Sequence, residues 1–235
     1  MTELTLTRPD AELRGTSTGT GPTVLLLHAG GETRDVWTPV AAVLNKHQQL
    51  LRTVAYDLRG HGDSSGQATE LGPIAADVSA MIHSEPPPIV VVGASLGGLA
   101  AIASLAAPPT AQAVAGLILV DVVPTPDITR VRAWLVDRGL RTHAPLVDDI
   151  FDQIPELQTT ATNLNLPIHL VRGGPTSPHT DADINRFRTT NPALTITQLP
   201  TAGHLIAHDA PDELARIIAT QTSAWLTTDP TPAHR

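Results

Sequence analysis

Several features common in proteins are missing from this sequence of 235 residues. It contains no cysteine, which excludes disulfide bonds, a thiol nucleophile and a zinc site with cysteine ligands. Aromatic residues make up only 3% of the chain, so we expect an aliphatic core and a substrate pocket with few surfaces for stacking. Lysine and arginine form no cluster and the net charge is -8, so no nucleic-acid partner is expected.

Long hydrophobic runs are also missing. No segment approaches the length that spans a bilayer, and residues 1–7 carry neither a basic leader nor the apolar stretch of a secretion signal. We therefore expect a cytoplasmic protein that does not contact a membrane. The length fits a single domain over residues 1–235, and no pattern specifies an oligomeric state.

Short apolar runs alternate along the chain with longer segments of helical pattern, which is typical of an α/β fold. The alternation predicts a mostly parallel central sheet with helices on both faces. Six strands are predicted, at residues 24–27, 51–56, 89–92, 117–120, 168–171 and 194–197. An antiparallel hairpin at the sheet edge is predicted from residues 4–6 and 11–14. Helices are predicted at residues 36–44, 74–82, 96–106, from 184 through 188 and beyond, and 211–226.

The pattern changes between residues 124 and 166. This segment contains Trp134, Leu135 and Ile150 but no strand pattern. We interpret it as a small helical cap inserted over the C-terminal edge of the sheet. Residues 229–235 are rich in turn-forming residues and are predicted to fray.

A serine in a glycine-rich turn is the strongest chemical signal in the chain. Residues 93–98 read Gly-Ala-Ser-Leu-Gly-Gly and lie between the strand predicted at 89–92 and the helix predicted at 96–106. This strand–turn–helix context is that of a nucleophile elbow, with Ser95 as the nucleophile. The turn is so tight that the residues two before and two after the serine must be small, as Gly93 and Gly97 are. The alternative is a small-residue turn that only packs a helix on a strand.

Two backbone amides near Ser95 are candidates for stabilising an oxyanion. Residues 28–31 read His-Ala-Gly-Gly and follow the strand predicted at 24–27, and Gly30 can present its N–H with no side chain in the way. Its partner would be the N–H of Leu96, at the positive end of the helix dipole. His28 itself is interpreted as a structural histidine that bonds nearby backbone.

His204 is the candidate general base. It follows the last predicted strand and precedes the last predicted helix, so it would lie at the sheet edge that carries Ser95. The chain contains ten histidines, so the position of His204 supports the assignment more than its residue type does. His208 is the local alternative.

Four segments, in this order along the chain, resemble the α/β-hydrolase superfamily. They are residues 28–31, 56–64 (Tyr-Asp-Leu-Arg-Gly-His-Gly-Asp-Ser), 93–98 and 202–204 (Ala-Gly-His). The resemblance runs over residues 24–226 and is greatest to small bacterial esterases, thioesterases and carbon–carbon hydrolases. It implies that these loops gather at one edge of the sheet and that residues 59–62 form a structural turn that braces the floor of the site.

The acidic residue is where the sequence departs from the family pattern. Family members commonly carry an aspartate shortly after the strand that corresponds to residues 168–171, and Ser177 stands at that place here. A serine cannot stabilise an imidazolium electrostatically. Asp121 ends the strand predicted at 117–120, a place that some family members, such as haloalkane dehalogenases, use for the acid. Asp181 or Asp183 is a second alternative, although Asp181 is equally suited to capping the next helix. A site without a working acid is the third.

The leading hypothesis is a serine hydrolase that cleaves a small-molecule carboxylic ester or thioester through an acyl-enzyme on Ser95, with His204 as base and Asp121 as acid. The departure at Ser177 motivates an alternative, a cyclase, lyase or epimerase on the same fold. A ligand-binding relative without activity is a further alternative. No phosphate-cradling loop or metal-ligand cluster is visible, so no cofactor or metal is expected, and a small-molecule substrate is the expected partner.

Overall fold

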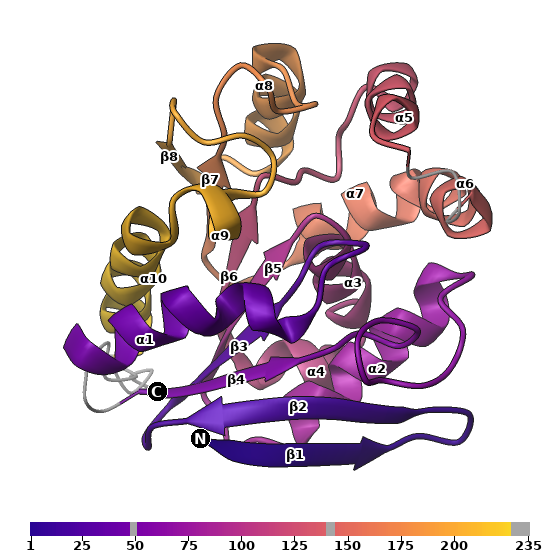
Figure 1. Ribbon diagram of the computed structural model, residues 1–235. Helices are drawn as coiled ribbons and strands as arrows, with labels where there is room; N and C mark the ends of the chain where they lie inside the picture. Colours follow the sequence, from indigo (N-terminus) through magenta and orange to yellow (C-terminus); the bar gives the residue numbers. More distant parts are fainter. Residues whose placement is uncertain (48–50, 140–143, 227–235) are drawn as a thin grey trace, which may run out of the picture.

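A twisted sheet of eight strands runs through the middle of the part of the chain that the structure describes (Figure 1). The structure is a computed structural model, and it describes residues 1–47, 51–139 and 144–226. The strands lie in the order β1-β2-β4-β3-β5-β6-β7-β8. Their bounds are Thr2–Thr7, Glu12–Thr18, Thr23–Leu27, Arg52–Tyr56, Ile89–Ala94, Val114–Val120, Ile168–Arg172 and Thr195–Gln198 for β1 to β8.

The predicted strand arrangement is confirmed. β1 pairs antiparallel with β2, and β2 pairs antiparallel with β4, so the predicted hairpin occupies the edge of the sheet. From β4 onward all neighbouring strands are parallel. The carboxyl ends of the parallel strands therefore meet at one edge, which is where ligands bind in open α/β sheets.

Helices cover both faces of the sheet, as predicted. In Figure 1, α1 and α10 lie on one face, and α2, α3, α4 and α7 lie on the other. The helices are η1 Arg34–Trp37, α1 Thr38–His47, α2 Leu71–His83, α3 Leu96–Ser104, α4 Pro108–Gln112, α5 Ile128–Asp137, α6 Ala144–Asp152, α7 Ile154–Asn163, α8 Asp181–Thr190, α9 Ile206–Asp209 and α10 Pro211–Leu226. The short helices α4 and α9 were not predicted, because five and four residues are too few to show a helical period.

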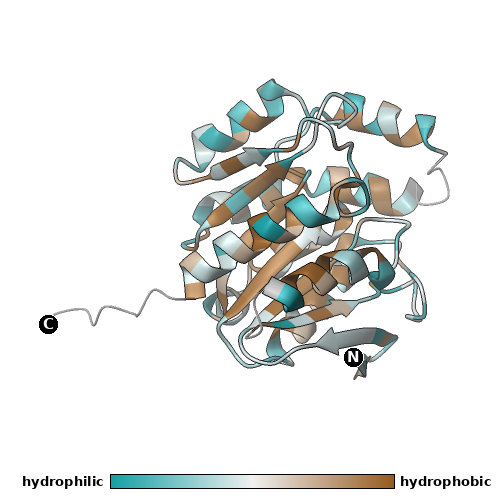
Figure 2. Cartoon of the chain, turned by 60° about the vertical axis from the view of Figure 1, so that its left-hand side comes forward, coloured by the Kyte–Doolittle hydropathy of each residue, from teal (hydrophilic) through white to brown (hydrophobic). Residues whose placement is uncertain are grey.

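The central strands are hydrophobic on both sides because both of their faces are covered. In β3, Val24 and Leu26 join the core against α1 and α10, while Leu25 and Leu27 join the core against α2 and α3. Figure 2 shows the central strands as hydrophobic and the covering helices as mixed in character. The core is aliphatic, as the low aromatic content predicts, and Trp37 is an exception in the layer under α1.

The segment from 124 to 166 is helical in the residues that the structure describes. Its helix α5 has no buried residue, whereas α6 buries Leu146 and Ile150. Helix α7 packs against α3 and buries Leu157 and Ala161 in the core. The predicted fraying of residues 229–235 lies outside the described residues. None of the described helices combines the length and hydropathy needed to cross a membrane.

Candidate active site

Ser95 stands at the turn between β5 and α3 with a left-handed backbone, φ 45° and ψ -112°. Such a conformation is strained for a residue with a side chain and persists only where the surroundings impose it. Here close backbone contacts do so. A Cβ on Gly93 would lie 2.5 Å from the Cα of Gly98, and a Cβ on Gly97 would lie 2.5 Å from the carbonyl oxygen of Leu27. The need for small residues on both sides of Ser95 is thus met as the sequence predicts.

Gly30 and Leu96, whose amides are predicted to hold an oxyanion, are neighbours in space. Gly30 is in van der Waals range of the Leu96 side chain, since a Cβ on Gly30 would lie 3.7 Å from Leu96 Cδ2. The Gly97 amide donates to the His28 carbonyl at 3.2 Å, which ties the two loops together. Within the loops and turns that the structure describes, neither the Gly30 nor the Leu96 amide donates to a backbone carbonyl. Both residues line the pocket that contains Ser95.

His204 and Asp121 form a hydrogen bond at the same edge of the sheet. The distance from His204 Nδ1 to Asp121 Oδ2 is 2.8 Å. Both side chains are buried. The other carboxylate oxygen, Asp121 Oδ1, accepts from the Gly173 amide at 2.7 Å. The carboxylate is therefore held on both sides, and it fixes the direction in which the His204 ring points.

Asp121 has an unusual backbone and a shifted acidity. Its φ of 46° is left-handed, and its amide donates to the Val171 carbonyl at 2.8 Å, which anchors the strained turn at the end of β6. Burial acts to raise the pKa of Asp121, but the hydrogen bond and charge of His204, with further help from His179 and the Gly173 amide, lower it below its ordinary value. The carboxylate is thus kept ionised, as a partner for an imidazolium must be.

The other acidic candidates have different partners. Asp181 is largely exposed and forms an ion pair with Arg172. Asp183 is buried and accepts from the backbone N–H and the hydroxyl of Thr180 at 2.6 and 2.7 Å. Thr180 is the cap of α8, so the predicted capping role of Asp181 is wrong, and Asp181 is the first residue of that helix.

Ser177 and His208 are also placed away from the His204–Asp121 pair. The Ser177 hydroxyl accepts from the His179 amide at 3.1 Å, and the Ser177 amide donates to Gly174, so Ser177 shapes its own loop. His208 has a side chain that is 78% exposed and lies near Asp209. Neither residue lines the pocket that contains Ser95.

The predicted structural role of His28 agrees with its contacts. Its ring is fully buried, with Nδ1 2.8 Å from the Ala29 carbonyl and Nε2 accepting from the Leu58 amide at 2.9 Å. Burial lowers the pKa of His28 to about 4, so the ring is neutral. In the neighbouring turn, Arg59 forms ion pairs with Asp77 and Asp10. These ion pairs hold the turn after β4, whose His61 lines the pocket.

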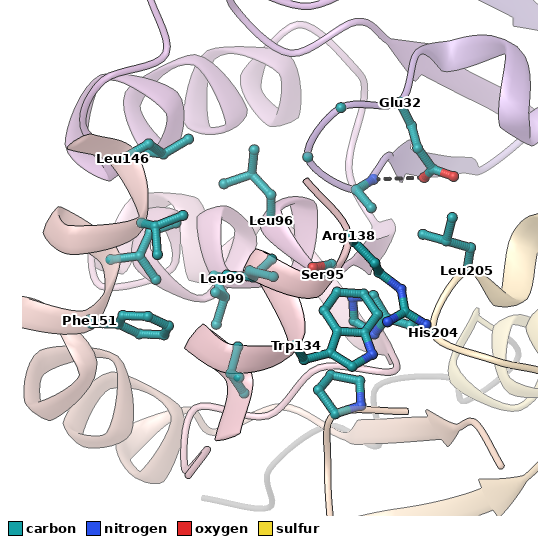
Figure 3. Close-up of a pocket in the computed structure, with 18 of the residues that line it drawn as sticks. Glu32, Ser95, Leu96, Leu99, Trp134, Arg138, Leu146, Phe151, His204 and Leu205 are labelled. Atoms are coloured by element: carbon teal, nitrogen blue, oxygen red, sulfur yellow. Dashed lines mark hydrogen bonds between the residues drawn. The ribbon is translucent and has the colours of Figure 1, made fainter. Parts of the chain in front are cut away.

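A cavity of about 350 Å³ opens over Ser95 (Figure 3). Ser95 and His204 both line it, together with residues of α5 and α6. Its walls are mostly aliphatic: Leu96, Leu99, Val131, Leu135, Leu146, Val147 and Ile150. A pocket with apolar walls and a few polar groups at one place is the usual form of a small-molecule site.

Sequence reasoning did not identify four residues near the reactive groups. Trp134 of α5 lies edge-on to His204, with 4.6 Å between ring centroids. His179 lies 6.1 Å from His204 by the same measure and is buried, and burial lowers its pKa to about 4. Glu32 and Arg138 line the pocket. No local pattern marks these residues, because each reaches the site through the packing of a loop or helix whose position the sequence does not reveal.

Glu32 is the only carboxylate among the described residues that line the pocket. Its Oε2 accepts from the Ala29 amide at 3.1 Å, so it supports the loop that carries Gly30. Burial raises the pKa of Glu32, an effect that the nearby amide of Ala29 and the charge of His204 partly oppose. Among the described residues no group of three or more His, Asp or Glu side chains has an arrangement that could hold a metal ion.

The chain resembles known proteins in sequence and in structure. A model of the alpha/beta hydrolase family matches residues 24–217. Protein phosphatase methylesterase 1 of Mus musculus is 37% identical over 110 residues, which cover 44% of this chain and 28% of that protein. A pimeloyl-[acyl-carrier protein] methyl ester esterase of Xanthomonas campestris is 35% identical over 116 residues, covering 49% of this chain and 42% of that enzyme. These matches therefore span less than half of each curated relative.

Among solved structures, the thioesterase domain from the curacin biosynthetic pathway superposes with a TM-score of 0.74. It is 22% identical and the match covers 94% of this chain and 99% of that domain, which shows a common fold. The family match extends over most of the sequence and includes the elbow at Ser95 and the loop of His204. The chain belongs to the alpha/beta hydrolase family.

Proposed function

We propose that this protein is a serine hydrolase that cleaves carboxylic esters or thioesters of small molecules through an acyl-enzyme on Ser95. His204 takes the proton of the Ser95 hydroxyl as that oxygen attacks the substrate carbonyl carbon. The amides of Gly30 and Leu96 donate hydrogen bonds to the oxyanion. His204 then gives the proton to the leaving alcohol or thiol, and later activates the water that releases the acid.

The observation that carries this proposal is the hydrogen bond between His204 Nδ1 and Asp121 Oδ2, on a histidine that lines the same pocket as Ser95. With Nδ1–H bound to Asp121, the other ring nitrogen of His204 is the one left to accept a proton. The ionised carboxylate stabilises the imidazolium that forms. We assign Asp121 as the acid for this reason.

The relatives support the reaction class. One curated relative is named a protein phosphatase methylesterase and another a methyl ester esterase, and one of the matching solved structures is a thioesterase domain. Ester and thioester hydrolysis both require attack on an acyl carbonyl carbon, and a serine at a nucleophile elbow can make that attack. We propose further that residues 1–235 form one domain and that residues 124–166 act as its cap over the pocket.

One rival function loses the observation that motivated it. A cyclase, lyase or epimerase was considered because Ser177 stands where the family acid is expected. Since Asp121 contacts His204, the position of Ser177 no longer implies that the histidine lacks an acid. A ligand-binding protein without activity would show no turnover that depends on Ser95.

The test is the hydrolysis of 4-nitrophenyl butyrate and 4-nitrophenyl hexanoate by the purified protein. Ser95→Ala is expected to lower kcat/KM by at least about a thousandfold, because the nucleophile is lost. Ser104→Ala is the matched control, since Ser104 lies at the other end of α3 and its hydroxyl donates to the Ala101 carbonyl at 2.8 Å. Equal activity of wild type and Ser95→Ala would exclude this function.

A further inference from the structure

The pocket has two unlike sides, with Ser95 between them. In Figure 3, Leu96, Leu99, Leu146 and Phe151 lie to one side of Ser95. On the other side the same figure places Glu32, Arg138 and Leu205 around His204. One half of the pocket is thus built for a hydrocarbon chain and the other half carries charged groups.

The chemistry of ester cleavage orients a substrate between these two sides. His204 must protonate the leaving oxygen or sulfur, so the leaving group lies on the side of His204. The acyl group then occupies the opposite, apolar side, because burying aliphatic chain against aliphatic walls is favourable. The charged residues around His204 therefore face the leaving group rather than the acyl chain.

Arg138 is the cation on the leaving-group side. It is the only lysine or arginine among the described residues that line the pocket. Its guanidinium carbon lies 3.9 Å from the centroid of the Trp134 ring, a stacked cation–π arrangement. Nearby, Arg132 forms an ion pair with Asp148, and Arg186 forms one with Asp183. Arg138 forms no ion pair with another described residue. Within the described ranges, no carboxylate is therefore paired with its charge.

Trp134 holds this cation close to the reacting atoms. The indole Nε1–H donates to the Thr176 carbonyl at 3.2 Å, and the ring meets the His204 ring edge-on at 4.6 Å. A stacked guanidinium keeps its N–H groups in one plane, free at their outer edge for a bidentate contact with a planar oxyanion. Arg138 is thus placed beside the histidine that delivers the leaving-group proton.

The charges of Glu32 and Arg138 near His204 determine which anionic group a leaving group can carry. Glu32 faces the same side of the pocket and its negative charge opposes a second negative charge there. A single guanidinium matches one carboxylate in charge and in geometry, whereas a phosphate dianion would bring two charges toward one arginine and one glutamate. The arrangement thus favours a carboxylate.

We propose that the site acts on esters with an aliphatic acyl chain and a leaving alcohol or thiol that carries a carboxylate, which Arg138 binds. This inference rests on the proposed serine-hydrolase function and names its substrate class. It makes Arg138 a specificity-determining residue rather than a participant in bond cleavage.

The experiment compares three octanoyl-length esters that release a nitrophenol. One carries its carboxylate on the leaving group, 4-nitro-3-(octanoyloxy)benzoate. The second, 2-nitrophenyl octanoate, is neutral, and the third, mono-2-nitrophenyl octanedioate, carries its carboxylate at the end of the acyl chain. Each kcat/KM is divided by the rate constant of hydrolysis by hydroxide, so that differences in leaving-group reactivity cancel. Arg138→Met, at the residue that caps the C-terminus of α5, is compared with the wild type and with Arg130→Met. Arg130 lies on α5 and its side chain does not line the pocket.

In the wild type, we expect the ester with the anionic leaving group to be preferred over the neutral ester by roughly five- to tenfold, the size of one charge-assisted contact near the surface. The ester with the anionic acyl end is expected to be the poorest of the three. Arg138→Met should reduce the first preference to about one, and Arg130→Met should retain it.

Two outcomes would overturn the inference. A preference that persists in Arg138→Met, with hydrolysis still dependent on Ser95, would exclude Arg138 as the anion-binding residue and leave the hydrolase function standing. A preference for the anionic acyl end would reverse the orientation of the substrate and so contradict the inference as well. Absence of any hydrolysis that depends on Ser95 would overturn the proposed function itself, which distinguishes the two failures.

Discussion

The floor and the roof of the pocket are built by different means. The floor consists of the strand-end turns that carry Ser95, Asp121 and His204, and backbone contacts and buried hydrogen bonds hold it in place. We call the side chains of α5 and α6 that line the pocket its roof, and α5 has no buried residue. Close backbone packing leaves a side chain few alternative positions, whereas an exposed helix depends on a few side-chain contacts.

This difference suggests that floor residues determine the rate of the reaction and roof residues determine which substrate is bound. In the proposed reaction, floor residues act on the ester bond, so a change there is expected to alter kcat. Roof residues would contact the parts of the substrate away from the bond. A change in the roof is therefore expected to alter KM or the choice of ester more than kcat or stability. Four substitutions, in order of decreasing expected effect, test this distinction between floor and roof.

Asp121→Asn is expected to produce the largest effect. The amide retains an acceptor for the Gly173 N–H but turns an N–H toward His204 Nδ1, which forces the other tautomer of the ring. We expect kcat to fall by about 10³ to 10⁴. The measurement is steady-state hydrolysis of a nitrophenyl ester. Asp181→Asn is the control, because Asp181 is exposed and pairs with Arg172, and comparable losses in both variants would contradict the assignment of the acid.

Gly97→Ala tests the rigidity of the floor. Its added Cβ would lie 2.5 Å from the Leu27 carbonyl oxygen, so the turn or the strand must shift. We expect a loss of about 3 kcal/mol in the free energy of unfolding, measured in urea, together with loss of activity. Gly72→Ala in α2 is the matched control, because a Cβ there meets nothing within 4 Å and alanine favours the helix. Equal stability of the two variants would show that the elbow is not tightly packed.

His179→Gln tests the buried surroundings of the His204–Asp121 pair. Burial lowers the pKa of His179 from 6.5 to about 4. Between these pH values the unfolded chain binds a proton at this position and the folded chain does not, so stability rises with pH in this window. The wild type should lose on the order of 2–3 kcal/mol more than His179→Gln between pH 7 and pH 4.

The control for this measurement is His208→Gln, which replaces a histidine whose side chain is 78% exposed. His28, also neutral at neutral pH, contributes a similar dependence in every variant and therefore cancels in the comparison. Identical pH profiles for wild type and His179→Gln would show that folding does not lower the pKa of His179.

Leu135→Ala tests the roof and should give the smallest change in stability. Leu135 lines the pocket but is only partly buried on α5, so we expect the free energy of unfolding to fall by less than about 1 kcal/mol. KM for an octanoyl ester should rise a few-fold while kcat stays within about twofold. Val136→Ala, whose exposed side chain does not line the pocket, should leave KM unchanged. If Leu135→Ala lowered kcat as much as a floor variant does, the proposed difference between floor and roof would be contradicted.

Much of the floor could be predicted because it depends on local chemistry. Short apolar runs between longer helical segments predict the strands. A serine between small residues at the end of a buried strand predicts the turn at Ser95. The position of His204 follows from the order of the elements, since the turn after β8 lies at the carboxyl edge of the sheet. These features depend on segments of fewer than about ten residues, each of which has a recognisable pattern.

The remaining features depend on geometry that no local pattern contains. Asp121 contacts His204, which lies far from it in the sequence, from a left-handed backbone conformation. An aspartate in a sequence does not by itself predict that conformation. For this reason the sequence left Asp181 and Asp183 open. Trp134 and Arg138 enter the pocket because α5 lies over His204, a tertiary arrangement that leaves no periodic signal on an exposed helix.

The most direct test of the central claim is labelling of the protein with a fluorophosphonate, followed by mass spectrometry of its peptides. The account predicts one modified residue, Ser95, with labelling abolished in Ser95→Ala and strongly slowed in Asp121→Asn, because the reagent reacts with an activated serine. Absence of labelling at Ser95 in the folded wild-type protein, or equal labelling rates in wild type and Asp121→Asn, would contradict it.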